Sequence, residues 1–283
     1  MTAEVTRGLR APGFLANLLR RIVTALVALP VLLAAFFLGP PALGVGIVAA
    51  AVLLGLFEFY GLVRARQLRP MVRTGLLLAA AMFAEVAWPG WFRAPYWPLA
   101  ALVLLSVTLA RGADFAESVS AAAATLLGAV YLGALGGTIA ALVVLDPPGE
   151  GAWRIVLLLA IIMVADTFAF FVGHAWGRHR LAPTVSPGKT VEGAVGGLSG
   201  GVVGALAVRA LGLPDLPLPH AIVLGGVVAA MGIVGDLDES LLKRWAGVKD
   251  SGTLFPGHGG MLDRLDSLLF GAPVLYYYFL YLR

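Results

Sequence analysis

About nine apolar runs, separated by short segments rich in Pro, Gly and charge, limit this chain to folds that use lipid as their solvent. A bilayer core of about 30 Å is crossed by a helix of about 20 apolar residues. Hydrophobic residues make up 60% of the 283 residues, above the usual share in soluble domains. We therefore predict an all-α, polytopic integral membrane protein with about nine transmembrane helices. The expected spans are 22–38, 41–62, 74–90, 96–110, 119–145, 153–173, 190–212, 219–235 and 267–282.

The positions of Arg and Lys predict the orientation of these helices, because loops rich in basic residues stay in the cytoplasm. Four arginines precede the first span, and four more follow the second span. Continued alternation places the loops 111–118, 174–189 and 236–266 on the same side. We expect a multi-pass protein of the cell inner (plasma) membrane, with its N-terminus in the cytoplasm and its C-terminus outside.

The two halves of the chain differ in the placement of polar residues. Residues 1–150 are rich in Ala, Leu and Val with scattered charges, and we predict that they form a scaffold of transmembrane helices. Residues 151–283 are expected to form a transmembrane catalytic region, with cytoplasmic site loops at 174–192 and 236–266. Glycines recur every four residues in the span 190–212, a spacing that lets helices approach closely. We expect the partner helix in the same chain and leave a homodimer interface open.

The segment from Gly235 to Asp266 concentrates the ionisable residues of this apolar chain. Asp236, Ser240 and Lys243 would share one face if the preceding span continued as a helix. The glycine-rich turn that ends at Gly260 leaves backbone N–H groups accessible to anions. Carboxylates hold Mg²⁺, and Lys and Arg neutralise phosphate oxygens. The segment therefore predicts a phosphate and metal site, whereas ordinary ion pairing at a membrane boundary would leave the glycine turn unexplained.

A second polar cluster runs from Ser186 to Gly193, where the seventh span begins. Ser186 followed by Pro187 is typical of a helix N-cap and first helical position. The positive end of the helix dipole, with Lys189 and Thr190, would then favour an anion. The alternative is a well-capped helix with a lysine that extends to the interface. All three lysines of the chain, Lys189, Lys243 and Lys249, fall in the two expected site loops.

Two further residues and the absence of cysteine narrow the chemistry. Asp166 lies inside the span 153–173, and an ionisable residue there indicates function unless it makes a structural hydrogen bond to another helix. His258 lies in the glycine turn, where it could bind phosphate or transfer a proton. With no cysteine and four histidines, we expect Mg²⁺ rather than zinc. No motif indicates nucleic acid, and the net charge of +4 suits anionic membrane lipids.

These residues together resemble a known family. Ser240-x-x-Lys243-Arg244, then Lys249-Asp250, then Pro256-x-His258-Gly259-Gly260-x-x-Asp263-Arg264-x-Asp266 resembles the signature of phosphatidate cytidylyltransferases, also called CDP-diacylglycerol synthases. Asp166-x-x-Ala169-Phe170-x-x-Gly173 and Ser186-Pro187-x-Lys189-Thr190-x-Glu192-Gly193 are similar to further family elements. Val191 departs from the pattern, since many members carry an aromatic residue there. The resemblance covers the C-terminal half by motif and the N-terminal half by hydropathy.

The resemblance implies that the protein joins CTP to phosphatidate, giving CDP-diacylglycerol and pyrophosphate, with Mg²⁺ and room for a second metal ion. It implies metal ligands at Asp236, Asp263, Asp266 and Asp166. Catalytic roles would fall on Asp236, Lys243, Arg244, Lys249, Asp250, His258, Asp263, Arg264 and Asp266. Substrate binding would fall on Ser186, Lys189, Thr190, Glu192, Glu239, Ser240, Gly259 and Gly260.

Two other functions stay open at this stage. A related CTP-dependent enzyme that acts on another lipid, such as a CDP-archaeol synthase or a lipid kinase, would keep a similar site. A membrane transporter would explain Asp166 and the glycine-rich helix. However, the polar residues gather on one expected side of the membrane, and no inverted repeat is evident. CDP-alcohol phosphatidyltransferases are disfavoured because their DGxxAR pattern is absent.

Overall fold

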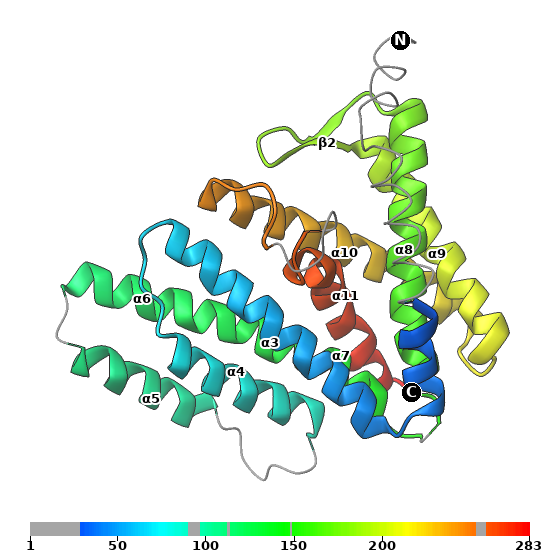
Figure 1. Ribbon diagram of the computed structural model, residues 1–283. Coiled ribbons are helices and arrows are strands. Elements are labelled where there is room, and N and C mark those ends of the chain that lie inside the picture. Colours follow the sequence, from blue (N-terminus) through cyan, green and yellow to red (C-terminus); the bar gives the residue numbers. More distant parts are fainter. Residues whose placement is uncertain (1–28, 90–96, 112–113, 148, 253–258) are drawn as a thin grey trace.

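Helices dominate the computed structural model of the chain, which describes residues 29–89, 97–111, 114–147, 149–252 and 259–283 (Figure 1). The first described helix covers Leu29–Leu38. The later elements are α3 (Pro41–Ala65), α4 (Val72–Ala87), α5 (Trp97–Ala110), α6 (Phe115–Gly128), the π-helical η1 (Ala129–Ala134), α7 (Leu135–Val144), α8 (Gly151–Trp176), β1 (Arg180–Ala182), β2 (Ser186–Thr190), α9 (Val191–Gly212), α10 (Leu218–Ala246) and α11 (Leu262–Tyr281).

Five helical segments in the described part of the chain are long and apolar enough to cross a membrane. They are α3, the continuous helix from Phe115 to Val144, α8, α9 and α10. Two shorter apolar helices, Leu29–Leu38 and Pro98–Ala110, accompany them. These five segments confirm the prediction of a helical protein with several segments able to span a membrane. The predicted count of nine transmembrane helices and their predicted orientation stay predictions.

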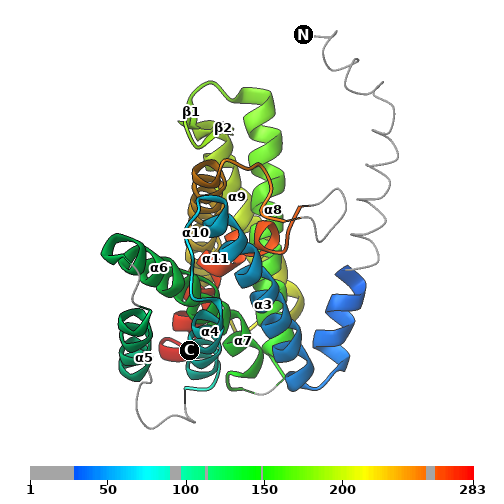
Figure 2. The ribbon, with the colours of Figure 1, turned by 60° about the vertical axis from the view of Figure 1, so that its left-hand side comes forward.

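Helix α9 packs between α8 and α10 through its glycines (Figures 1 and 2). A Cβ atom added at Gly204 would lie 2.7 Å from the carbonyl oxygen of Ala160 in α8. One added at Gly201 would lie 2.5 Å from the carbonyl oxygen of Gly225 in α10. Both distances are too short for a side chain, so the backbones meet only because these positions lack one. The expected partner within the same chain is confirmed.

A two-stranded antiparallel hairpin, β1–β2, is the departure from helix within the described residues. It corrects the expected start of the seventh helix. Ser186 lies in β2 and pairs with Ala182, whereas α9 starts at Val191. The N-cap is Thr190, whose hydroxyl accepts a hydrogen bond from the Gly193 amide at 3.1 Å. The Ser–Pro pair is thus drawn into extended structure by a partner strand that local sequence does not reveal.

At one end of the helix bundle, the helix ends that carry many of the predicted site residues lie close together. The hairpin joins the C-terminal end of α8 to the N-terminal end of α9, and α10 ends beside them (Figure 2). Helix α10 extends past the apolar span 219–235 to Ala246 and stops at Gly247, which has a φ of 76°. The extension confirms that the helix continues through Lys243. The segment 236–266 is therefore partly helical rather than entirely loop.

Candidate functional site

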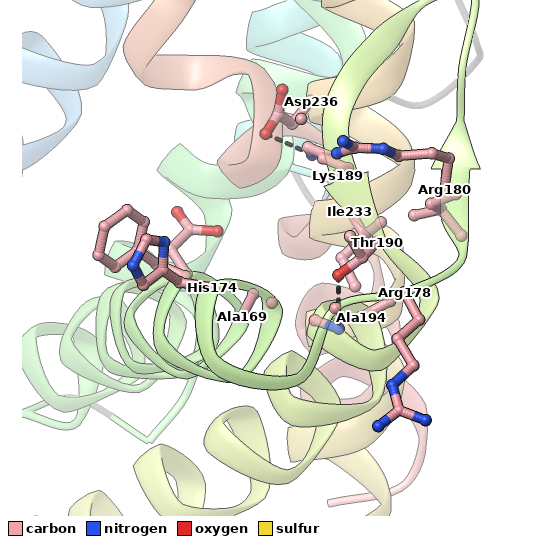
Figure 3. Close-up of a pocket in the computed structure, with 16 residues that line it drawn as sticks. Ala169, His174, Arg178, Arg180, Lys189, Thr190, Ala194, Ile233 and Asp236 are labelled. Atoms are coloured by element: carbon pink, nitrogen blue, oxygen red, sulfur yellow. Dashed lines mark hydrogen bonds and ion pairs between the residues drawn. The ribbon is translucent and has the colours of Figure 1, made fainter. Parts of the chain in front are cut away.

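A cavity of about 580 Å³ lies at this end of the bundle, between α8, the hairpin, the start of α9 and the middle of α10 (Figure 3). Its walls combine charged side chains with apolar ones, a mixture that suits a ligand with both an ionic and a lipid part. The described lining residues include Asp166, Ala169, Phe170, His174, Arg178, Arg180, Lys189, Thr190, Gly193, Ile233 and Asp236.

An ion pair between Lys189 and Asp236 crosses this cavity. The Lys189 Nζ lies 2.5 Å from Asp236 Oδ2, and both side chains are partly exposed. Ser240, one turn later on α10, donates to Asp236 Oδ1 at 3.4 Å. Strand β2 and helix α10 thus bring together a cation and a carboxylate that α9 separates along the chain. The two expected site loops meet here.

Two more carboxylates, Asp166 and Asp266, lie near Asp236. Asp166 lines the same cavity from α8. Asp266 lies in the first turns of α11, before the apolar run 267–282. Burial, followed by the neighbouring Asp236 carboxylate, raises the pKa of Asp266 to about 7. Among the described residues, neither Asp166 nor Asp266 has a cation within ion-pair distance. Within this group of described carboxyl groups, Lys189 is paired with Asp236.

A second network surrounds Lys243. Its Nζ contacts Glu239 Oε2 at 2.5 Å and Asp263 Oδ1 at 2.6 Å. The other oxygen of Asp263 accepts from the Ser251 hydroxyl at 2.7 Å, from the Ser251 amide at 3.0 Å and from the Gly260 amide at 2.7 Å. Burial favours protonation of Asp263, but hydrogen bonds with Glu239, Lys243, Gly260 and Ser251 outweigh it and hold the pKa of Asp263 well below its usual range.

Glu58, from α3, belongs to this second network. Its Oε2 accepts from the Leu262 amide at 2.8 Å and from the Ser251 hydroxyl at 3.2 Å. Our sequence reasoning did not single this residue out. The signal was present, because Glu58 is an acidic residue inside the apolar span 41–62, and the argument used for Asp166 applies to it equally. The contact also crosses the predicted division at residue 150.

Comparison with known proteins identifies the family of this chain. The model of the cytidylyltransferase family matches residues 19–282. The chain belongs to the cytidylyltransferase family. It is 33% identical to a phosphatidate cytidylyltransferase of Synechocystis sp., over 92% of this chain and 95% of the relative. It is 35% identical to one of Pseudomonas aeruginosa, over 90% and 94%. A third, of Thermotoga maritima, is 46% identical over 46% and 50%.

In this member of the cytidylyltransferase family, two predicted residues brace the hairpin. Glu192 accepts from the backbone amides of Arg178 and His179 at 3.0 and 3.2 Å, and its other oxygen lies 2.6 Å from His179 Nδ1. Arg244 donates from Nε to the Val185 carbonyl at 3.4 Å and so ties α10 to the hairpin. These contacts position β2, which carries Lys189.

The remaining predicted residues are assigned to neither network, and one of them lies outside the described residues. Lys249 and Asp250 are exposed, and Gly259 has a φ of 78°, which favours glycine. Arg264 is exposed on α11, and His258 lies outside the described residues. The sequence analysis missed Arg180, which extends from β1 toward Lys189 (Figure 3). Its place in the loop 174–192 was the available signal.

The described side chains bear on the expected metal site. Within the described ranges, no three residues among His, Cys, Asp and Glu are arranged as a metal-binding group. Asp166, Asp236 and Asp266 influence one another electrostatically and all offer carboxylate oxygens. Such oxygen donors are chemically suited to Mg²⁺. Asp263 differs from them because its oxygens already contact Lys243, Ser251 and Gly260.

Proposed function

We propose that this chain transfers a cytidylyl group from CTP to phosphatidate, giving CDP-diacylglycerol and pyrophosphate. The observation that carries the proposal is the similarity to two phosphatidate cytidylyltransferases over at least 90% of the chain. The ionic cavity supports it, since Lys189, Arg178 and Arg180 lie there beside the exposed aromatic ring of Phe170. A phosphate bound to an acyl-bearing glycerol presents the same combination of charge and apolar surface.

The reaction needs no covalent intermediate on the protein. An oxygen of the phosphatidate phosphate attacks the α-phosphorus of CTP, and a new P–O bond forms. The P–O bond between the α-phosphorus and the bridging oxygen breaks, and pyrophosphate leaves with that electron pair. Catalysis then depends on holding two anions in line and on offsetting their charge. Lys189, Arg180 and the N-terminal amides of α9 would bind and orient the phosphates.

We propose that Asp166, Asp236 and Asp266 hold Mg²⁺ when the nucleotide binds. The ion would offset charge on the transferring phosphoryl oxygens. Lys189, which lies in the cavity beside Asp236, would contact a phosphate oxygen of the bound substrate. Asp263 would act by positioning Lys243, since its oxygens are already occupied by donors. The lysine would in turn face the polyphosphate.

We propose further that the end of the bundle carrying the cavity faces the cytoplasm, where CTP is found. The support is the distribution of arginines in the sequence, which favours the cytoplasm for the loops 174–192 and 236–266. The protein would then be a multi-pass protein of the inner (plasma) membrane that takes phosphatidate directly from the lipid.

The test is the synthesis of CDP-diacylglycerol from labelled CTP and phosphatidate by purified protein in detergent, with and without Mg²⁺. Product that depends on the metal supports the reaction. Product with another lipid acceptor but not with phosphatidate would indicate the related CTP-dependent enzyme. Folded protein that makes no product from any acceptor and binds no CTP would favour a transporter.

A further inference from the structure

Helix α11 begins with an amide that its own sequence does not satisfy. The first N–H groups of a helix lack partners within the helix and are usually met by a local N-cap side chain. The N-cap position of α11 is Met261, whose side chain makes no capping hydrogen bond. The Leu262 amide is instead bound by Glu58 Oε2 at 2.8 Å, from a helix 204 residues earlier in the chain. The carboxylate of Glu58 thus accepts the hydrogen bond that a local N-cap side chain usually accepts.

The same Glu58 oxygen also reaches the residues that hold Asp263. The Ser251 hydroxyl lies 3.2 Å from Glu58 Oε2 and 2.7 Å from Asp263 Oδ2. A hydroxyl has one proton, so Ser251 donates a hydrogen bond to one of the two carboxylates at a time. Both carboxylates lie within hydrogen-bond distance of this hydroxyl. The Leu262 amide that Glu58 binds directly precedes Asp263. Glu58 therefore binds the first residue of α11 directly, and Ser251 lies within hydrogen-bond distance of both Glu58 and Asp263.

The backbone closes tightly around this carboxylate. A Cβ atom at Gly252 would lie 2.4 Å from Glu58 Oε1, and one at Gly260 would lie 2.3 Å from Glu58 Oε2. Only residues without a side chain leave room for the carboxylate at these two positions. The space is shaped for a planar group that reaches from α3, and a shorter or apolar side chain would not fill it in the same way.

We propose that Glu58 is a positioning residue of the reaction, which fixes Asp263, and through it Lys243, in the geometry that transfer of the cytidylyl group requires. This inference rests on the proposed function for its catalytic part. Lys243 lies 2.6 Å from Asp263, and Asp263 is anchored by Ser251 and Gly260 on the far side of that contact. Loss of the Glu58 contacts frees the start of α11 and shifts Asp263 relative to the lysine.

Three substitutions of Glu58 separate the effect of its side-chain length from the effect of its negative charge. Glu58→Gln keeps an oxygen at the distance of Leu262 and removes the charge. Glu58→Asp keeps the charge and withdraws the oxygen by about one C–C bond, roughly 1.5 Å. Glu58→Ala removes both. A positioning role predicts a kcat within threefold of wild type for Gln and a loss of at least tenfold for Asp and Ala. A role of the charge itself predicts the opposite order for Gln and Asp and would overturn the proposal.

Hydrogen exchange of the Leu262 amide supplies a measurement that does not depend on catalysis. We expect exchange in the peptide with Leu262 to speed up at least tenfold in the Asp and Ala variants and to stay unchanged in the Gln variant. Peptides from α9 report whether the rest of the protein is folded, and rates are normalised to the folded fraction. Glu117→Ala, which removes an exposed acidic residue of α6 paired with Arg69 at 3.7 Å, is the control and should change neither quantity.

The kinetic measurement and the hydrogen-exchange measurement test separate parts of the proposal. Unchanged exchange at Leu262 in Glu58→Ala would overturn the positioning contact itself. Faster exchange with full activity would show that the contact holds the helix without serving the reaction, and this also overturns the proposal. Wild-type protein that makes no CDP-diacylglycerol with Mg²⁺ would defeat the proposed function, while the exchange measurement would still decide whether Glu58 fixes α11.

Discussion

Lys189 and Lys243 each contact carboxylates, but their surroundings differ in a way that matters for function. Lys189 lies in the cavity, paired with Asp236, and its side chain is partly exposed. Lys243 is more deeply placed and contacts both Glu239 and Asp263. A lysine open to the cavity can exchange its carboxylate for a phosphate, whereas a lysine held between two carboxylates is a fixed charge. The two residues should therefore respond differently to substitution.

Lys189→Met keeps the aliphatic length of the side chain and removes the cation. We expect kcat/KM for CDP-diacylglycerol synthesis to fall about 100-fold or more, since loss of one preorganised electrostatic contact costs about that factor. The measurement is steady-state synthesis at varied CTP and phosphatidate. Arg73→Gln, an exposed residue of α4, serves as the control. A rate within threefold of wild type would remove Lys189 from the phosphate contacts.

Asp263→Asn should abolish synthesis and lower stability together. The side-chain amide has one oxygen, whereas Asp263 accepts hydrogen bonds on both of its oxygens. In one orientation its NH₂ group faces Lys243, and in the other it faces the amides of Ser251 and Gly260. Each leaves buried donors unpaired, at a cost of about 1–3 kcal/mol. Thermal unfolding in detergent, with synthesis measured on the folded fraction, checks both effects. Wild-type activity in the Asp263→Asn variant would show that the Asp263 hydrogen bonds are not needed for synthesis.

At this scale the sequence predicted what lies on a single helix. The spacing of Asp236, Ser240 and Lys243 indicated one face of α10, and the contacts of Ser240 with Asp236 and of Lys243 with Glu239 confirm it. Pairs between elements did not follow from spacing. The contact of Lys189 with Asp236 depends on how α9 folds back, and the place of Glu58 depends on where α3 crosses α11.

At the scale of elements, hydropathy located the helices well because each apolar run is long and bounded by turn residues. Each of the nine runs overlaps a helix over most of its described length, although the run 190–212 begins in β2 and the run 74–90 extends past the end of α4. The hairpin was missed because its strands are short, and strand formation depends on the partner more than on local sequence. The glycine pattern of α9 predicted close packing correctly, since small residues at a spacing of four line one helical face.

Gly201→Ala should destabilise the bundle, because the added methyl group would lie 2.5 Å from the Gly225 carbonyl oxygen. We expect a loss of about 1–3 kcal/mol, as is usual for overpacking. Gly226→Ala is a matched control on α10, where an added Cβ meets no atom within 4 Å. Thermal unfolding followed by size-exclusion chromatography in detergent compares the two. Equal unfolding midpoints for the two variants would show that α9 and α10 can move apart at Gly201 with little loss of stability.

At the scale of the whole molecule, the residues that line the cavity are gathered toward one end of the helices. The opposite end holds a different arrangement, in which the buried Arg154 donates to the carbonyl of Asp146 at 2.8 Å and pairs with Glu150. Glu150 also contacts Arg283 at 3.1 Å. Those contacts tie loop and helix ends together away from the cavity. Which end faces the cytoplasm is a question that single-cysteine labelling can answer directly.

The absence of cysteine in the chain makes each introduced cysteine a unique reporter. Thr184→Cys lies in the exposed turn of the hairpin, and Asp215→Cys lies in the exposed connection between α9 and α10. With the cavity in the cytoplasm, a membrane-impermeant maleimide should label Cys at 215 on intact spheroplasts and Cys at 184 only after permeabilisation. The reverse pattern would invert the proposed orientation.

The contact between Glu58 and Leu262 has a consequence for how such proteins can diverge. The acceptor and its donor belong to opposite halves of the chain, 204 residues apart, so neither half is free to vary alone at this point. A recombinant that joins residues 1–150 of one family member to 151–283 of another inherits a working start of α11 only when both parents place these two groups at the same separation. The hydrogen bond between Glu58 and Leu262 thus couples sequence change in one half of the chain to sequence change in the other.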